Sequence, residues 1–122
     1  MLSLPLPVRV FLCTEPADMR RSFDGLARLV REFLGADPLS GHLFVFRSKR
    51  GDRVKLLYWL GDGLAIWYRR LEKGTFRFPE ATGNGVGVEL RAADLAMLLD
   101  GVELDSVKRR PRYQRSGDAA TD

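Results

Sequence analysis

Residues 47–70 read RSKRGDRVKLLYWLGDGLAIWYRR, and this stretch decides the fold. Segments 53–60 and 64–71 are rich in β-branched and aromatic residues, which predicts two strands. The Gly-Asp-Gly triplet between them predicts a tight turn. Working outward, a Lys-Arg-Gly-Asp turn predicts a preceding strand at 42–48, and a Glu-Lys-Gly turn predicts a following strand at 75–78. Consecutive antiparallel strands of this kind form a meander.

The flanking segments add helices and outer strands. Residues 8–13 predict a first strand, and residues 14–35 predict an amphipathic helix with a stop at Gly35. Residues 83–90 predict a glycine-rich loop with one short strand, and 91–101 predict a second helix with Leu95, Leu98 and Leu99 on its apolar side. The first helix has this apolar stripe: Met19, Phe23, Leu26, Val30 and Phe33.

The fold class expected is α+β. It comprises an antiparallel meander of about four to six strands, one amphipathic helix on the core face of the sheet, and a second, C-terminal helix. Residues 1–106 are expected to form a single domain. Residues 107–122 read as a basic tail that is disordered in isolation.

Turn lengths predict which side chains share a face of the sheet. A two-residue loop at 50–51, followed by three-residue loops in the later hairpins, separates two sets. The first set is a core face that the first helix is expected to cover: Leu43, Val45, Val54, Leu56, Tyr58, Ile66, Tyr68, Phe76 and Phe78. The second set mixes large apolar and basic groups: His42, Phe44, Phe46, Lys55, Leu57, Trp59, Ala65, Trp67, Arg69 and Arg77. A slip of one residue in a later hairpin exchanges the faces of the strands beyond it.

The charge of the chain is unevenly distributed. The net charge is +4, yet residues 47–77 carry nine basic and three acidic side chains. Residues 78–106 carry one basic and six acidic side chains, and residues 107–122 carry five basic and two acidic ones. This asymmetry indicates either a polyanionic partner or an acidic segment folded over a basic one.

The basic residues predict a DNA-binding surface, because phosphate contacts supply affinity without sequence information. The candidates on the sheet and its turns are Arg47, Lys49, Arg50, Arg53, Lys55, Arg69, Arg70, Lys73 and Arg77. The candidates in the tail are Lys108, Arg109, Arg110, Arg112 and Arg115. The hairpin tip at 49–50 would probe the major groove, which admits a two-stranded ribbon. The alternative interpretation is that these charges form an ordinary solvated surface.

The aromatic residues of the second face support a different hypothesis, a protein-docking surface. Aromatic and arginine side chains are enriched in protein interfaces. The candidate anchors are Phe44, Phe46, Trp59 and Trp67. The alternative is that the second helix covers them as part of the core. A docking surface predicts a homo-oligomer or a mixed complex.

Other function classes find little support in the sequence. One cysteine, Cys13, permits no internal disulfide and fits a reducing cytoplasm, and one histidine, His42, makes a zinc site improbable. No apolar run reaches the roughly 18 residues of a membrane span. The candidate carboxylates do not converge as a metal-dependent nuclease requires: Asp18, Asp24, Asp52, Asp62 and Glu72. We therefore expect no catalytic residues, no metal and no cofactor.

Four stretches together resemble one protein family: PADMRRSFDGL (16–26), SGHLFVFRSKRGDRVKLLYW (40–59), GDGLAIWYRRLEKGTFRFP (61–79) and LAMLLDG (95–101). It is the second-open-reading-frame-like family of the insertion-sequence-66 group of bacterial transposable elements. The sequence departs from the family at Leu60, where an acidic residue is common, at Phe78, where tryptophan is common, and at Arg91, where threonine often caps the helix.

The resemblance implies a biological process and a set of partners. Such a protein is a non-catalytic accessory of transposition, and the transposase of the element is a separate protein. The expected partners are element-end DNA, the transposase of the element or another accessory protein, and a second copy of the chain. Binding to DNA is expected to weaken when residues 108–122 are removed, with the fold left intact.

Overall fold

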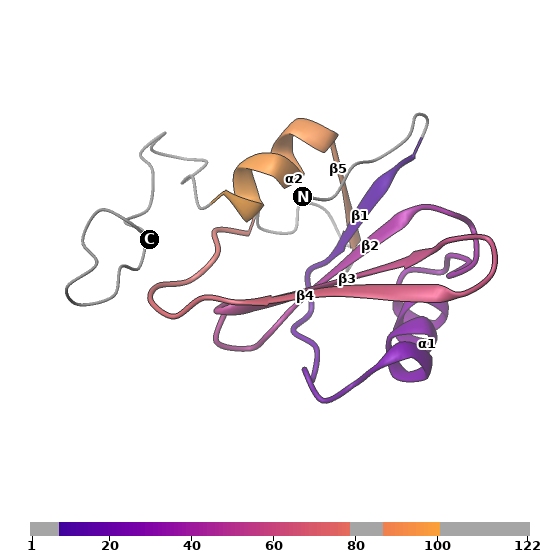
Figure 1. The fold of residues 1–122 in the computed structure, drawn as a ribbon, viewed down its shortest axis with the longest axis horizontal. Helices are drawn as coiled ribbons and strands as arrows, with labels where there is room; N and C mark the ends of the chain where they lie inside the picture. Colours follow the sequence, from indigo (N-terminus) through magenta and orange to yellow (C-terminus); the bar gives the residue numbers. More distant parts are fainter. Residues whose placement is uncertain (1–7, 79–86, 101–122) are drawn as a thin grey trace.

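The computed structural model describes residues 8–78 and 87–100, which form one five-stranded sheet and two helices (Figure 1). The strands run in the spatial order β4-β3-β2-β1-β5. The elements in chain order are β1 (Val10–Cys13), α1 (Phe23–Phe33), β2 (Leu43–Arg47), β3 (Arg53–Trp59), β4 (Leu64–Arg70), β5 (Gly87–Leu90) and α2 (Ala92–Leu99). The expected α+β class, with mostly antiparallel strands, is confirmed.

The sheet is mixed, because its first strand runs parallel to its second. β1 pairs parallel with β2 and antiparallel with β5, whereas β2, β3 and β4 form the antiparallel meander that the sequence predicts. The chain leaves β1, forms α1 and returns as β2, and such a crossover produces parallel neighbours. The position of β1 inside the sheet accounts for its apolar sequence, VFLC.

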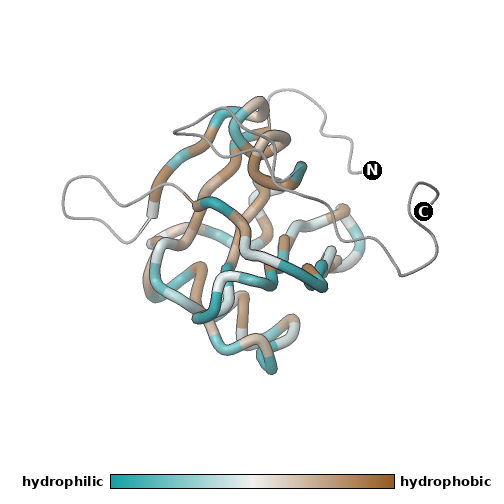
Figure 2. Tube along the Cα trace, turned by 90° about the vertical axis from the view of Figure 1, so that its left-hand side faces the viewer, coloured by the Kyte–Doolittle hydropathy of each residue, from teal (hydrophilic) through white to brown (hydrophobic). Residues whose placement is uncertain are grey.

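The two helices cover opposite faces of the sheet, and their assignment is the reverse of the expected one. α1 packs on the face that holds Phe44, Phe46 and Leu57. α2 packs through three leucines on the face that holds Leu43 and Val45. Figure 1 shows the helices on either side of the strands, and Figure 2 shows hydrophobic residues running along the strands.

The turn between β3 and β4 is one residue shorter than predicted. The Leu60 N–H donates to the Gly63 carbonyl at 2.9 Å, so the loop consists of Gly61 and Asp62 alone. The resulting register pairs Leu56 with Trp67. Every side chain of β4 therefore lies on the face opposite to the predicted one, whereas the register of β2 with β3 is as predicted.

The predicted strand at 75–78 is wrong. The Phe76 N–H donates to the Gly51 carbonyl at 2.8 Å, so this segment crosses the β2–β3 turn instead of extending the meander. The Phe76 side chain is buried in the core beneath α2. Among the described strands, β4 consequently pairs on one side only.

The first helix begins later than predicted. Residues 14–22 are not helical, and Asp18 instead accepts hydrogen bonds from the backbone and guanidinium of Arg20. Gly35 ends the helix as expected, with a φ of 60° that an L side chain rarely adopts. The second helix starts at Ala92, and the Asp94 carboxylate, at the third helical position, accepts the Arg91 N–H.

Candidate nucleic-acid interface

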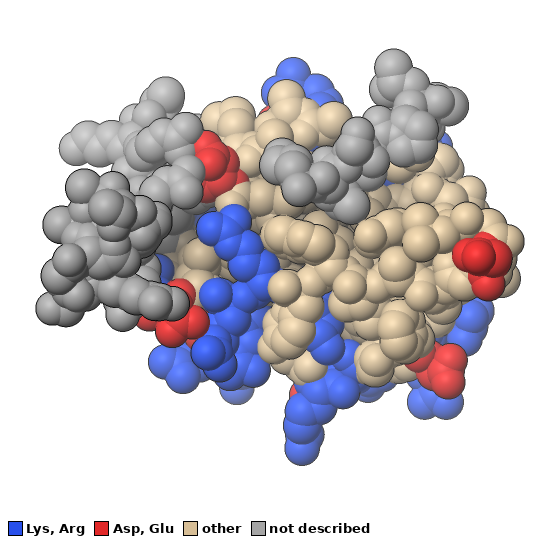
Figure 3. Space-filling model, viewed as in Figure 1, with Lys and Arg blue, Asp and Glu red and all other residues tan. Residues whose placement is uncertain are grey.

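Basic side chains gather at one end of the sheet, where β2 ends, β3 begins and β4 ends. Two hydrogen bonds, from the Leu71 N–H to the Asp52 carbonyl and from the Phe76 N–H to the Gly51 carbonyl, bind the segment 71–78 to the β2–β3 turn. Residues 47–53 and 69–77 together carry eight basic and two acidic side chains. Figure 3 shows basic atoms clustered on this side, beside the 71–78 segment of Figure 1. We call this group the basic end.

At the centre of the basic end, two arginines face each other across neighbouring strands. Arg53 of β3 pairs directly with Arg70 of β4. Like charges in directly opposite positions of a sheet are destabilising. Among the described residues, Glu72 is the acid that pairs with them: its carboxylate lies 3.4 Å from Arg70, and both side chains are more than half exposed. An exposed pair of this kind contributes little to stability, and the two arginines with Glu72 keep a net positive charge at this end of the sheet.

The turn that carries Lys49 and Arg50 is held rigidly from below. Ser48 is buried, and its hydroxyl accepts the N–H groups of Gly51 and Arg53 at 3.2 and 3.0 Å. The same hydroxyl donates to the Asp52 carboxylate at 3.2 Å. Lys49 and Arg50 are both exposed at the tip. The turn therefore presents two cations on a fixed backbone.

Two further arginines of the basic end form contacts with backbone carbonyls and aromatic rings of the protein itself. The Arg47 Nε donates to the Thr14 carbonyl at 3.1 Å, and the guanidinium lies over the Phe78 ring. Arg69 donates to the Leu99 carbonyl at the end of α2 and lies over the Phe76 ring. Both side chains are half-buried. They add positive potential but have fewer free donors than Lys49 or Arg50.

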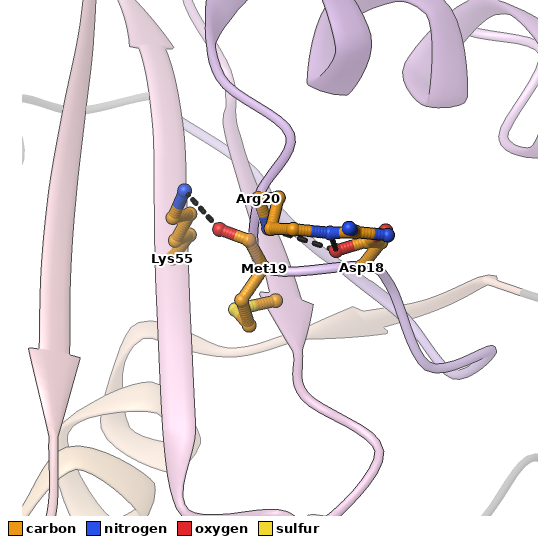
Figure 4. Close-up of polar contacts among 4 residues, drawn as sticks. All are labelled: Asp18, Met19, Arg20 and Lys55. Carbon is orange, nitrogen blue, oxygen red and sulfur yellow. Dashed lines mark hydrogen bonds and ion pairs between the residues drawn. The ribbon is translucent and has the colours of Figure 1, made fainter.

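Lys55 is not part of this surface, which corrects the prediction. Its side chain is 7% exposed and points beneath the segment that precedes α1. The ammonium donates to the Met19 carbonyl at 2.8 Å (Figure 4). It also donates to the Arg21 carbonyl at 2.7 Å and lies 4.7 Å from the centre of the Tyr68 ring. A phosphate cannot reach this group, because backbone carbonyls and an aromatic face already surround it.

The segment that receives Lys55 is itself held by an ion pair. The Arg20 guanidinium donates to the Asp18 carboxylate at 2.8 Å, as Figure 4 shows. Hydrogen bonds from Arg20 lower the pKa of the Asp18 carboxyl to about 2. The two residues of this contact lie on either side of Met19, whose carbonyl accepts a hydrogen bond from Lys55.

The four predicted aromatic anchors do not form one surface. Phe44 and Phe46 are fully buried beneath α1. The shorter β3–β4 turn places Trp67 on the α2 side of the sheet. Trp59 lies two residues after buried Leu57 on β3, so it shares the α1 side with Leu57. Both tryptophans are only half-buried, yet they lie on opposite faces. Two of the four candidate anchors, Phe44 and Phe46, are therefore core residues. The other two, Trp59 and Trp67, lie on opposite faces of the sheet and cannot form one docking surface.

The remaining candidates fall into two groups. Arg53, Arg70, Lys73 and Arg77 all belong to the basic end, and Lys73 and Arg77 are exposed there. The tail candidates lie outside the described residues: Lys108, Arg109, Arg110, Arg112 and Arg115. Their contribution to DNA binding stays a prediction.

The residues considered for catalysis have structural partners. His42 accepts the Arg9 N–H through Nδ1 at 3.1 Å and packs edge-on against Phe11. Cys13 is buried, and burial raises the pKa of its thiol. Asp52 and Asp62 lie in turns at opposite ends of β3. Across residues 8–78 and 87–100, no three histidine, cysteine or acidic side chains come together to hold a metal, and no described helix could span a bilayer.

Sequence reasoning missed Ser48 and Tyr68. Ser48 organises the basic turn, and its position four residues before Asp52 was the available signal, since short polar side chains close turns. The Tyr68 hydroxyl accepts a 3.4 Å hydrogen bond from Arg53, and its ring contacts Lys55. The register error hid Tyr68, because it placed this residue on the wrong face.

Comparison with known proteins places the chain in a family. The model of the IS66 Orf2-like proteins matches residues 8–109. The uncharacterized protein y4jC of Sinorhizobium fredii is 38% identical over 104 residues, which cover 85% of this chain and 87% of that protein. The uncharacterized protein y4hO of the same organism is 38% identical over 96 residues, covering 79% and 82%. No solved structure matches significantly. The chain therefore belongs to the IS66 Orf2-like family, an accessory family associated with insertion-sequence transposition.

Proposed function

We propose that this protein is a non-catalytic accessory of transposition that binds DNA phosphates through its basic end while a separate transposase performs the chemistry. The family supports the process. The observation that carries DNA binding is the direct Arg53–Arg70 pair, which costs stability unless an anion lies between or above the two guanidinium groups. Lys49 and Arg50 extend the same positive end on a rigid turn.

The geometry favours phosphate contact over base reading as the main source of affinity. Guanidinium groups bind phosphate with two parallel hydrogen bonds, and a short row of them follows a backbone. The basic turn is a two-stranded tip that fits a major groove, so base contacts are the expected refinement and not the basis of binding. The tail supplies a second basic segment in the sequence.

Adaptor function without DNA binding is the weaker alternative. Phe44 and Phe46 are buried, so they cannot anchor a partner without unfolding α1 from the sheet. The half-buried Trp59 and Trp67 lie on different faces and cannot serve one flat interface together.

The test is fluorescence anisotropy with labelled element-end DNA and a scrambled duplex, at low and near-physiological salt. We expect both duplexes to bind, with affinity falling steeply as salt rises. The double variant Lys49→Gln/Arg50→Gln should weaken binding about tenfold and reduce the salt slope by about two. A truncation that removes 108–122 measures the contribution of the tail separately.

The matched control is Arg28→Gln/Arg31→Gln on α1, which removes the same charge from exposed positions on a helix away from the basic end. It should retain most of the affinity. Equal losses in the two double variants would mean that net charge alone attracts DNA. Absence of binding at low salt would refute the proposal and return the adaptor hypothesis to first place.

A further inference from the structure

One edge of the sheet, β4, offers a row of backbone groups that no described strand uses. β4 pairs with β3 through seven consecutive residue pairs, and within residues 8–78 and 87–100 no strand pairs with its other side. The hydrogen bonds Leu60 N–H to Gly63 O and Leu71 N–H to Asp52 O bracket this ladder. Backbone bonding alternates along an antiparallel strand. Leu64, Ile66, Tyr68 and Arg70 therefore direct their N–H and C=O groups away from β3.

The centre of this edge lacks the features that normally protect edge strands. Residues 64–68, LAIWY, contain no charge, no proline and no glycine, and the seven pairs with β3 leave no bulge. Apolar side chains at this edge are exposed: Leu60, in the turn before β4, is 64% exposed, and Tyr68 of β4 is 47% exposed. An open backbone row with apolar neighbours is a template for another strand.

The charges at the two ends of β4 are of opposite sign. Arg70 lies at its carboxyl end, and exposed Asp62 lies in the turn before its amino end. Figure 3 shows basic atoms toward the end where β4 finishes, acidic atoms toward the β3–β4 turn, and mainly uncharged surface between them. A strand that is positive at one end, negative at the other and apolar between is complementary to itself in the antiparallel direction.

We propose that a second copy of this chain pairs with β4 through its own β4, antiparallel and centred on Ile66, to form a continuous ten-stranded sheet. In this register Tyr68 faces the Leu64 of the second copy, and Trp67 faces its Ala65, so a large side chain meets a smaller one on both faces. Arg70 comes beside the turn that carries Asp62 of the second copy. Two-fold symmetry repeats each contact.

Other registers satisfy the backbone but not the charges. Centring the pair on Trp67 or on Ala65 also matches the outward groups. Those registers place Arg70 opposite Leu64 or Leu60, where no acidic side chain lies. Charge complementarity therefore selects Ile66 as the centre.

The test measures the mass of the full chain, without DNA, by analytical ultracentrifugation over a wide range of protein concentration. We expect a reversible dimer. Asp62→Arg places like charges together twice in each dimer and should raise the dissociation constant about tenfold. The double variant Asp62→Arg/Arg70→Asp exchanges the two charges and should restore dimerisation, which a merely structural effect of either substitution would not do.

The control is Glu89→Arg, which makes the same change of charge on β5, the other edge strand, and also breaks the 2.6 Å ion pair of Glu89 with Arg9, so its folding is checked separately by urea denaturation. It should leave the dimer intact. A monomer at every concentration, a dimer that Glu89→Arg dissociates, or a failure of the charge exchange to rescue would each overturn the proposal. Since no DNA is present, none of these outcomes depends on the proposed DNA-binding function.

Discussion

The basic residues of β3 and β4 lie in two different environments, an exposed one at the basic end and a buried one beneath the segment before α1. At the basic end, Arg53 and Arg70 face each other and stay available to solvent. Two residues along β3, Lys55 is buried and surrounded by carbonyls and an aromatic ring. The first arrangement leaves most of the positive charge open to solvent, and the second encloses it with hydrogen-bond acceptors and an aromatic face. Whether a basic residue of these strands is available for binding or holds the fold together thus depends on whether another segment covers its side chain.

The largest expected effect comes from removing the satisfied cation. Lys55→Ala should lower the free energy of unfolding by about 3 kcal/mol, because two partly buried carbonyls lose their donor and the segment before α1 loses its link to β3. Urea denaturation measures this change. Lys49→Ala, at an exposed lysine of the basic end, is the control and should change stability by less than about 0.5 kcal/mol. Equal losses in the two variants would contradict the distinction.

A smaller effect is expected at the serine that supports the basic turn. Ser48→Ala should cost about 1.5 kcal/mol, because the Gly51 and Arg53 N–H groups lose a buried acceptor. Ser40→Ala is matched in chemistry but exposed, and should cost about 0.5 kcal/mol or less. Thermal unfolding of both variants distinguishes them. A harmless Ser48→Ala would mean that the backbone alone holds the turn.

The smallest effect has the opposite sign. Arg53→Gln should raise stability by about 0.3 kcal/mol at low salt, because it relieves the like-charge pair with Arg70. Salt should abolish this gain, since it screens the repulsion that the substitution removes. Urea denaturation at two salt concentrations is the measurement. Any loss of stability would show that the Tyr68 hydrogen bond outweighs the repulsion.

The sequence predicts much of the fold because its signals are local. The turn at 49–52, the strand periodicity, the glycine stop at Gly35 and the leucines of α2 all depend on neighbouring residues, and each is confirmed. The β3–β4 turn fails because Gly61-Asp62-Gly63 accommodates two-residue and three-residue loops alike. That one-residue difference exchanged the faces of β4 and separated Trp67 from Trp59.

The candidate site is less predictable, because it depends on contacts between distant segments. In the sequence Lys55 lies among other basic residues. In the structure its ammonium is buried, because it donates to the carbonyls of Met19 and Arg21. The sequence of segment 75–78 predicts a strand beside β4. Instead, the Phe76 N–H donates to the Gly51 carbonyl, so β4 is the edge of the described sheet. Charge counting finds the basic region, whereas only the register shows that Arg53 and Arg70 face each other.

The burial of Lys55 has a practical consequence for chemical labelling. The chain has four lysines, Lys49, Lys55, Lys73 and Lys108. Lys49 and Lys73 are exposed at the basic end, whereas the ammonium of Lys55 is enclosed. An amine-reactive reagent followed by peptide mass mapping should therefore modify the first two rapidly and Lys55 only when the domain unfolds. The protein carries its own integrity marker, so protection of Lys49 and Lys73 by a bound polyanion can be separated from a change of folding in one experiment.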